Sequence, residues 1–536
     1  MILLAALPLL FCACAKSTPK AAGANVFHVG NRSEVQDLDP HLCSGVAEFR
    51  ALGALFEGLC VLDPRTMQPK PGAAAAWTLS GDGRVYTFDL QPNGKWSDGT
   101  PLTAEDFVYS WQRMLTPALG GEYAYLLHCL KNGKAFNEGK LSDFSQVGVK
   151  ALSPLKLEVT LESPVPYFLS MQIHFAWHPV PRHVIEKFAP MAQRGSAWTR
   201  AENHVGNGPF KVTSWRPDEV LETVRNPHYW DAANVKPDGI SFYPIANEQQ
   251  EERRFRTGAL DMTYTVPMHM IEEYKAAHAD ELVLAPFLQT YYYRFNCSKP
   301  PFNDPRVRRA FSMALDREEI AKHVAKAGEQ PAYAFVPPNT AGYTCAYKAP
   351  ADLEAARALL AEAGYPGGKG LPPLDLLYNT SESDKLFSEA VQRQWKEGLG
   401  ADVRLLNQEY KVYLDSMSRL NYDICRSTWL GDVLDPINFL ECFLTGQGNN
   451  RCGYSSPEFD ALIAQVYAES DPARRADLMQ QAERRLLEDS PFAPMLYMTQ
   501  KFLLRPGISG AETNLLGYFR WQDFARAPQA AAEGTS

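Results

Sequence analysis

The stretch LPPLDLLYNTSESDKLFSEAVQRQWKEGLGADVRLLNQE, residues 371–409, changes its pattern twice. Its two ends, residues 371–381 and 401–409, are short apolar runs typical of strands. Residues 385–399 between them have apolar side chains at helical spacing. A strand, a helix and a second strand in this order predict a βαβ unit, in which helices cover the faces of a sheet. We therefore expect an α/β fold.

Strand signals recur in the N-terminal half of the chain. Residues 25–56 are expected to form a strand, a loop and a helix. Further strands are expected at residues 85–90, 156–164, 205–215 and 219–231. The first of these, VYTFDL, alternates apolar and polar residues, as a strand with one buried face does.

Helix signals are strongest where a capping residue precedes an apolar stripe. Thr103 is a suitable N-cap with Asp106 three residues later. The helix that follows is expected to bury Phe107, Trp111 and Leu115. Tyr109 lies about 200° around that helix from Phe107 and falls outside the stripe.

Proline in the first helical position marks three more helices. They begin after Asp304, Ser456 and Asp471, and the first is expected to run through residues 305–326. Another helix, residues 353–365, is expected to stop at Gly364.

Length and composition limit the class of protein. The chain has 536 residues, too many for one ordinary core, so about two to four domains are expected. Apolar residues make up 45% and charged residues 21%, which is typical of globular proteins. The net charge is −9, and no basic run or basic helix is present, so nucleic acid is not an expected partner.

The N-terminal sequence MILLAALPLLFCAC resembles the apolar core of a secretory signal and is too short to span a bilayer. Its end resembles a loose bacterial lipobox, which would make Cys14 the lipid-bearing first residue of the mature protein. A plain secretion signal cleaved nearby is the alternative. We assign residues 1–24 to the signal, lipobox and tether, and residues 528–536 to a disordered tail.

Eight cysteines remain after the first two, and in an exported chain some can form disulfides. The spacing of Cys442 and Cys452 suits a short bridged loop, and free buried thiols are the alternative. No zinc-type Cys/His spacing is present, and no metal or cofactor is expected. The phosphate-loop, HExxH and GxSxG motifs of common enzymes are also missing, so catalysis is not expected.

One further stretch, CRSTWLGDVLDPINFL, residues 425–440, concentrates chemistry in a segment broken by glycine and proline. It contains Arg426, Trp429, Asp432 and Asp435. A solvated loop with an Asp-Pro turn explains Asp435. A binding site for a ligand with charge at both ends explains Arg426 and Asp432 better.

Several segments together resemble the bacterial extracellular solute-binding proteins of family 5, above all its oligopeptide-binding members, which feed ABC importers. The similarity runs from about residue 26 to residue 523. The matching segments are residues 33–41, 94–115, 226–242, 299–320 and 426–440.

The resemblance implies a periplasmic-binding-protein-like fold of type II (cluster C), with two lobes built from three domains, a hinge and a buried ligand cleft. Domain I would comprise residues 25–56, 181–289 and 499–527, domain II residues 57–180, and domain III residues 290–498.

The resemblance also implies a function. A short peptide would be held in extended conformation between the lobes and delivered to membrane permease subunits by a monomeric, exported protein, lipid-anchored on the periplasmic or extracellular face. Alternatives inside the family are murein peptides, dipeptides, haem, nickel complexes or sugars. Outside transport, the alternatives are a surface lipoprotein and a peptide-cleaving enzyme.

Site residues follow from the resemblance, position by position. Asp432 falls on the aspartate that pairs with the peptide α-ammonium, Trp429 lies beside the peptide, and Arg426 falls on a carboxylate-binding residue. The other positions expected to contact ligand are Tyr109, Gly45, Val46, Tyr264, Thr265 and Tyr292.

Four positions depart from the family pattern. Ser44 replaces a glutamate near the peptide N-terminus, and Asp384 and Met417 replace basic residues that bind peptide carboxylates. Leu430 replaces a cysteine of a nearby disulfide. The carboxylate end is thus reduced to Arg426, and we hypothesise a narrower preference for ligand length or a ligand whose far end is not a simple carboxylate.

Overall fold

Three separate sheets organise the chain in a computed structural model that describes residues 25–527. The expectations for residues 1–24, including Cys14, and for residues 528–536 lie outside this range. No helix within the described residues is long and apolar enough to cross a membrane.

The first sheet belongs to the predicted domain I and has the strand order β1-β10-β9-β8. β1 and β10 are parallel, and the other pairs are antiparallel. The strands are β1 (Val26–Gly30), β8 (Phe210–Arg216), β9 (Val220–Arg225) and β10 (Gly239–Tyr243), and the helices nearby are α1 (Val46–Leu55), α5 (Arg182–Phe188), α6 (Glu248–Arg256) and α7 (Ile271–Ala277). The expected strand, loop and helix of residues 25–56 are confirmed.

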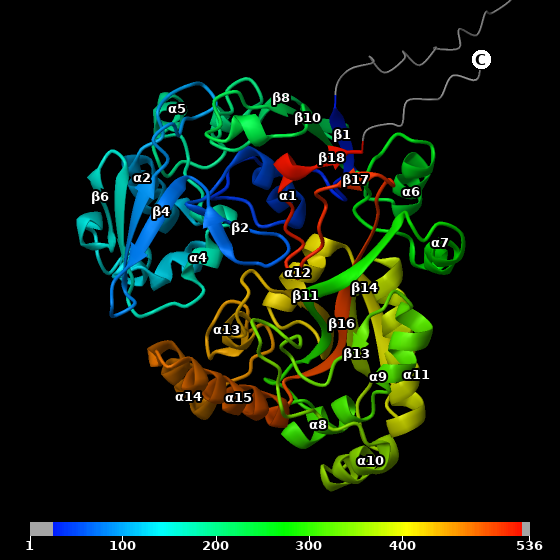
Figure 1. The fold of residues 1–536 in the computed structure, drawn as a ribbon. Coiled ribbons are helices and arrows are strands. Elements are labelled where there is room, and N and C mark those ends of the chain that lie inside the picture. Colours follow the sequence, from blue (N-terminus) through cyan, green and yellow to red (C-terminus); the bar gives the residue numbers. More distant parts are fainter. Residues whose placement is uncertain (1–24, 528–536) are drawn as a thin grey trace, which may run out of the picture.

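The second sheet lies within the predicted domain II, at the left of Figure 1, and is antiparallel with the order β4-β5-β7-β6. Its strands are β4 (Ala74–Leu79), β5 (Val85–Leu90), β6 (Val149–Ser153) and β7 (Lys156–Thr160); a small ribbon of β2 (Cys60–Leu62) and β3 (Pro69–Pro71) precedes it, and its helices are α2 (Ala104–Leu115), α3 (Gly133–Asn137) and α4 (Phe168–Met171). α2 begins with the expected capping box, because Thr103 and Asp106 exchange hydrogen bonds. Its expected stripe is fully buried.

The third sheet is the largest and has the order β12-β16-β11-β15-β13-β14. Its strands are β11 (Leu282–Phe295), β12 (Gln330–Pro331), β13 (Leu374–Asn379), β14 (Val403–Gln408), β15 (Ile424–Leu430) and β16 (Phe492–Leu503). β13 and β14 are parallel and α11 (Glu382–Leu399) connects them, so the predicted βαβ unit is confirmed.

Helices cover both sides of this sheet (Figure 1). They are α8 (Pro305–Met313), α9 (Arg317–Ile320), α10 (Leu353–Glu362), α12 (Tyr410–Ser418), α13 (Ile437–Leu440), α14 (Pro457–Ala468) and α15 (Pro472–Asp489). Asp304, Ser456 and Asp471 cap α8, α14 and α15 as expected. The single helix predicted over residues 305–326 is wrong, because Asp316 accepts a backbone hydrogen bond from Glu319 and starts a new helix.

Two long strands connect the lobes. β11 and β16 pair antiparallel from Leu282 opposite Leu503 to Arg294 opposite Phe492, and Figure 1 shows them running from domain I into domain III. Their register shifts between Pro286 and Thr290. The domain limits predicted after residues 289 and 498 fall within these two strands, close to that irregularity. A short pair, β17 (Ile508–Ser509) and β18 (Ala525–Arg526), returns the chain to domain I.

Candidate ligand-binding site

Asp432 lies where domain II meets domain III. β15 carries the chain up to Leu430, and Gly431 passes so close to Leu288 that an added Cβ would lie 2.5 Å from its side chain. The backbone N–H of Asp432 then donates to Asn438 Oδ1 at 2.8 Å. Tyr125, from domain II, donates its hydroxyl to Asp432 Oδ2 at 3.2 Å. The carboxylate is thereby held at the boundary between the lobes.

The charge of Asp432 has no opposite charge beside it. Among the described residues it makes no ion pair within 4.0 Å. Burial raises its pKa to about 6, and hydrogen bonds from Tyr125 and Asn438 offset only part of that rise. A half-buried carboxylate without a cation is costly, and a ligand ammonium would stabilise its ionised form.

Tyr123 and Tyr125 complete this end of the site. Their ring centroids lie 6.0 Å apart, and the charge of Asp432 raises the pKa of both phenols in addition to the larger effect of burial. Both were missed from the sequence. The signal was present in GGEYAYLL, residues 120–127, where two aromatic residues stand two apart at the start of a 3-10 helix, η2 (Ala124–Cys129).

The structure does not bring Tyr109 to this place. Tyr109 is 4% exposed on α2, with Arg182 stacked 5.3 Å from its ring centre. Burial and, next, Glu186 raise its pKa to about 12. The position is off the stripe of Phe107 as predicted, but the ring contacts Arg182 rather than Asp432.

Arg426 lies on β15 and is already neutralised by another residue. Its Nε lies 2.7 Å from Asp384 Oδ1, and its guanidinium stacks 4.9 Å from the ring centre of Tyr291. Tyr291 also donates its hydroxyl to the same Asp384 oxygen at 3.1 Å. Asp384, which replaces a basic residue of the family, is thus paired with Arg426, the residue that was expected to bind a ligand carboxylate.

The other predicted residues of domain III divide between wall and core. Trp429 is half-buried next to Leu430, and its indole Nε1 has no hydrogen-bond partner among the described residues. Tyr292 is completely buried, between Phe335 and Phe492, so it belongs to the core. The preceding residue on β11, Tyr291, faces Arg426 instead, because successive side chains of a strand point to opposite faces.

Met417, the other departure from the family pattern, is also in the interior. It is 5% exposed and accepts hydrogen bonds from the hydroxyls of Tyr413 and Ser427 through its sulfur.

The remaining predicted site residues belong to the predicted domain I. Ser44, Gly45 and Val46 form the accessible start of α1, where Gly45 is the N-cap. Tyr264 and Thr265 are half-buried, and their backbone N–H groups donate to the two oxygens of the Glu251 carboxylate.

The predicted bridge between Cys442 and Cys452 is not formed in this structure, in which both thiols are free. Cys442 donates to the carbonyl of Asn438, whereas Cys452 donates to the side chain of Asn450. The two sulfurs therefore point to different local partners.

Asp435 opens a turn as expected, because it accepts the N–H of Ile437 at 3.0 Å. It is also buried in a two-pronged ion pair with Arg475, at 2.8 and 2.9 Å. That second role gave no sequence signal, because α15 lies far along the chain.

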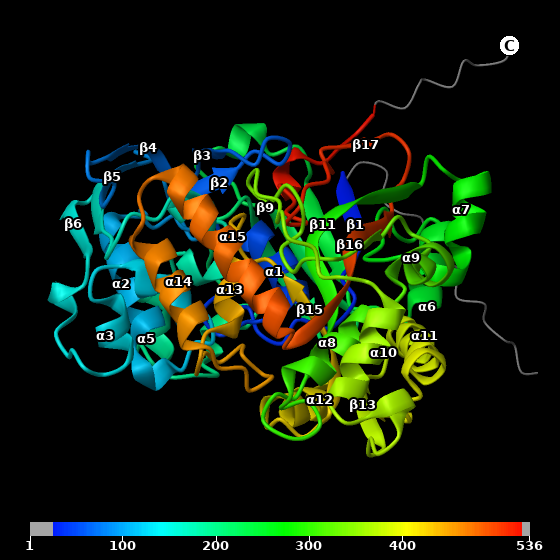
Figure 2. The same cartoon turned by 90° about the horizontal axis from the view of Figure 1, so that it is seen from below.

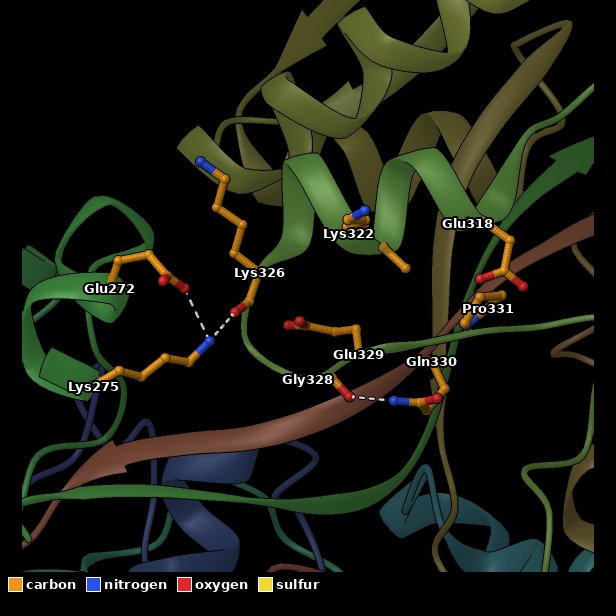
Figure 3. A pocket seen from close by; sticks show the side chains of 10 residues that line it. Glu272, Lys275, Glu318, Lys322, Lys326, Gly328, Glu329, Gln330 and Pro331 are labelled. Atoms are coloured by element: carbon orange, nitrogen blue, oxygen red, sulfur yellow. Dashed lines mark hydrogen bonds and ion pairs between the residues drawn. The ribbon is translucent and has the colours of Figure 1, made fainter. Parts of the chain in front are cut away.

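A surface groove of about 590 Å³ lies elsewhere, between α7 and residues 318–331 (Figure 3). It contains none of the predicted site residues. Its Lys275 already pairs with Glu272 and with the carbonyl of Lys326. No group of three or more metal-ligating side chains occurs within residues 25–527.

Fold and site together define an extracellular solute-binding protein. The family model "Bacterial extracellular solute-binding proteins, family 5 Middle" matches residues 68–451, and the chain belongs to this family. The periplasmic oligopeptide-binding protein OppA of Salmonella typhimurium is 40% identical over 489 residues, which cover 90% of this chain and 88% of that protein.

Solved structures agree with the fold. The murein tripeptide-binding protein MppA of Escherichia coli aligns with a TM-score of 0.86 at 34% identity, over 94% of this chain and 99% of its own. Haemophilus influenzae OppA in complex with the peptide RPPGFSPFR aligns with a TM-score of 0.83 at 32% identity and the same coverage. The unliganded open form of MppA, over 94% and 98% of the chains, reaches only 0.73 at 34% identity. The fold is the type II periplasmic-binding fold. The lower TM-score indicates that the arrangement of the lobes differs more from the open form of MppA than from the other MppA structure.

Proposed function

We propose that this protein captures short peptides in extended conformation between its lobes and delivers them to the permease of an ABC importer. In this proposal the protein is exported, anchored by a lipid on Cys14, and has no catalytic activity. The similarity to peptide-binding proteins such as OppA and MppA supports the class of ligand.

The observation that carries the proposal is the unpaired carboxylate of Asp432 at the lobe boundary. A peptide α-ammonium is a cation that every peptide presents at one end, whatever its sequence. Bound there, it would make a charge-assisted hydrogen bond to Asp432 in a site closed from bulk water. Hydrogen bonds to the peptide backbone, like those between neighbouring β-strands, would add affinity that does not depend on the side chains of the peptide.

Native mass spectrometry of the purified protein with its co-purified ligand tests the class of solute. We expect a pool of short peptides, and a single metal complex, haem or sugar would contradict the proposal. Calorimetry then compares wild type with Asp432→Asn. We expect a loss of peptide affinity of about 2 kcal/mol, typical of a hydrogen bond to a charged group.

Asp415→Asn is the matched control for this comparison, because Asp415 is an exposed residue of α12 that pairs with Arg419. It should leave peptide affinity unchanged. Equal peptide affinities for wild type and Asp432→Asn would mean that Asp432 does not bind the peptide ammonium.

A further inference from the structure

Arg32 is a cation without an acidic partner on the wall of domain I. It follows β1, its side chain is exposed, and among residues 25–527 it makes no ion pair. Its guanidinium lies 5.5 Å from the ring centre of Tyr264. Its backbone has φ = 59°, a left-handed conformation that is uncommon for residues other than glycine. Such backbone conformations cost free energy and persist where the surrounding structure determines them.

The Arg32 guanidinium packs on Tyr264, a residue predicted to contact the ligand. Tyr264 raises the pKa of Arg32, whereas the like charge of Arg426 lowers it, so the two guanidiniums are close enough to repel each other. Arg426 is neutralised by Asp384, whereas Arg32 is not. Glu248 also acts on Arg32, but burial raises the pKa of Glu248 and it lies outside ion-pair distance.

Tyr410 connects this cation with the Asp432 end. Tyr410 is 56% exposed at the start of α12, and its phenol acts electrostatically on both Arg32 and Tyr123. Tyr123 in turn lies near Asp432. Asp432 and Arg32 are therefore two opposite charges, in the predicted domains III and I, that make no ion pair among residues 25–527.

We propose that Arg32, rather than Arg426, binds the terminal carboxylate of the ligand. The planar guanidinium fork matches a carboxylate in two parallel hydrogen bonds, and Tyr264 supports its other face. This inference rests on the proposed function, because it takes the ligand to be a peptide with a free carboxyl end.

The test compares peptides of two to six alanines as free acids and as C-terminal amides, by calorimetry. We expect wild type to prefer the acid by roughly tenfold or more at the length that spans from Asp432 to Arg32. Arg32→Gln should bring this ratio near one while leaving the affinity for the amide unchanged. Arg419→Gln changes an exposed arginine just after α12; it is the control and should keep the ratio.

Each of the other possible results of this calorimetry leads to one conclusion about the anchor or the function. If wild type binds acid and amide equally at every length, peptide capture stands and the Arg32 anchor is wrong. If Arg32→Gln keeps the ratio and Arg426→Gln abolishes it, the anchor is Arg426. If wild type binds no peptide in either form, the proposed function fails together with this inference.

A separate observation concerns Cys297 and Cys452. The backbone N–H of Cys297 donates to the carbonyl of Cys452 at 2.9 Å, whereas the thiols of the two residues donate to Phe295 O and Asn450 Oδ1. One backbone hydrogen bond of this length keeps the two Cα atoms within roughly the 4.4–6.8 Å found for bridged cysteines. Cys297 is half-buried, and Cys452 is completely buried. Burial raises the pKa of Cys452, but the Cys297 thiol and Arg294 more than offset this, and the thiolate is the reactive form.

We infer that Cys297 and Cys452 form a disulfide when a disulfide oxidant is present. One cysteine thiolate attacks a sulfur of oxidised glutathione and releases a glutathione thiolate. The second thiolate then attacks the mixed disulfide and releases the other glutathione. The protein loses two protons and two electrons, one S–S bond forms in it, and the glutathione S–S bond is reduced to two thiols.

Peptide mapping after treatment of the folded protein with oxidised glutathione and then an alkylating reagent tests this step. We expect a linked peptide pair containing Cys297 and Cys452, with Cys345 found as a free, alkylated or unmodified residue. Cys345 serves as the matched buried thiol outside the pair. Complete alkylation of both Cys297 and Cys452, or a link between Cys442 and Cys452, would overturn the inference.

Discussion

Three charged side chains on or just after β15 show how burial and pairing separate structural from binding residues. Asp435 is buried and fully paired with Arg475. Arg426 is half-buried and paired with Asp384. Asp432 is half-buried and has only neutral hydrogen-bond partners. Because an unpaired buried charge costs free energy, Asp432 is the position where an external cation adds the most stability.

The pH dependence of peptide binding should follow the ionisation of Asp432. Its pKa is raised to about 6, and only the carboxylate binds an ammonium, so affinity should fall by about tenfold from pH 7 to pH 5. Calorimetry over this range gives the measurement. Asp432→Asn should bind weakly with no such slope. Glu441→Gln should retain the slope, although burial raises the pKa of nearby Glu441 to about 7.

The ion pair of Arg426 and Asp384 should matter for stability. Asp384→Asn leaves a half-buried guanidinium without its carboxylate and is expected to lower the free energy of unfolding by about 3 kcal/mol. The double change Asp384→Leu with Arg426→Met should restore most of this loss. Urea denaturation checks both variants. Asp415→Asn, from an exposed pair, should lose little, and an equal loss there would remove the special role of the buried pair.

At the scale of elements, the wall of domain I depends on the close approach of β1 to α6. Glu251 on α6 reaches over the end of β1 and accepts two backbone hydrogen bonds from residues 264–265. Gly30 makes room for it, because an added Cβ would lie 1.7 Å from the Glu251 Oε1 atom. Tyr264, whose ring packs against the Arg32 guanidinium, is thereby positioned with the help of Gly30.

Gly30→Ala should therefore displace Glu251 and leave two N–H groups without an acceptor. We expect a loss of about 2 kcal/mol in the free energy of unfolding, measured by guanidinium chloride denaturation. Gly53→Ala in α1 is the control, since nothing lies within 4 Å of its added Cβ. It should be neutral or slightly stabilising, because alanine favours helix. Similar losses in both variants would argue against this contact.

At the scale of the whole molecule, two lobes are linked by β11 and β16 and touch across the site. Tyr125 of domain II bonds to Asp432 of domain III, and Arg475 on α15 stacks 5.7 Å from the ring centre of Tyr167. Figure 2 shows α15 extending from domain III toward the strands of domain II. Closure of such lobes is a hinge motion, and contacts made only in the closed form set its population.

Tyr125→Phe removes one contact between the lobes and should shift the unliganded protein toward open conformations. A hydrogen bond to a charged group is worth about 1–2 kcal/mol, so the closed fraction relative to the open one should fall by roughly tenfold. Small-angle scattering would show a larger radius of gyration. Tyr467→Phe is the control, because Tyr467 donates to Glu441 within domain III. An identical scattering curve for Tyr125→Phe and wild type would contradict this reading of the contact.

Local sequence determined most of the elements. The βαβ unit of residues 371–409, the capping box of Thr103 and Asp106, and the proline-started helices α8, α14 and α15 were all predictable, because caps and apolar spacing act within a few residues. The stretch around Asp432 was also recognisable, since opposite charges stand close together in a broken apolar segment.

Only the tertiary structure decided which side chains meet. Arg426 and Asp384 lie 42 positions apart by their residue numbers, yet they neutralise each other, and Tyr125 reaches Asp432 over a separation of 307 residues. Tyr291 and Tyr292 look alike in sequence and both are buried, but strand alternation sends Tyr291 to Arg426 and Tyr292 to Phe335 on the other face. Pairing between distant residues depends on how sheets and lobes pack, and a local sequence pattern does not determine that packing.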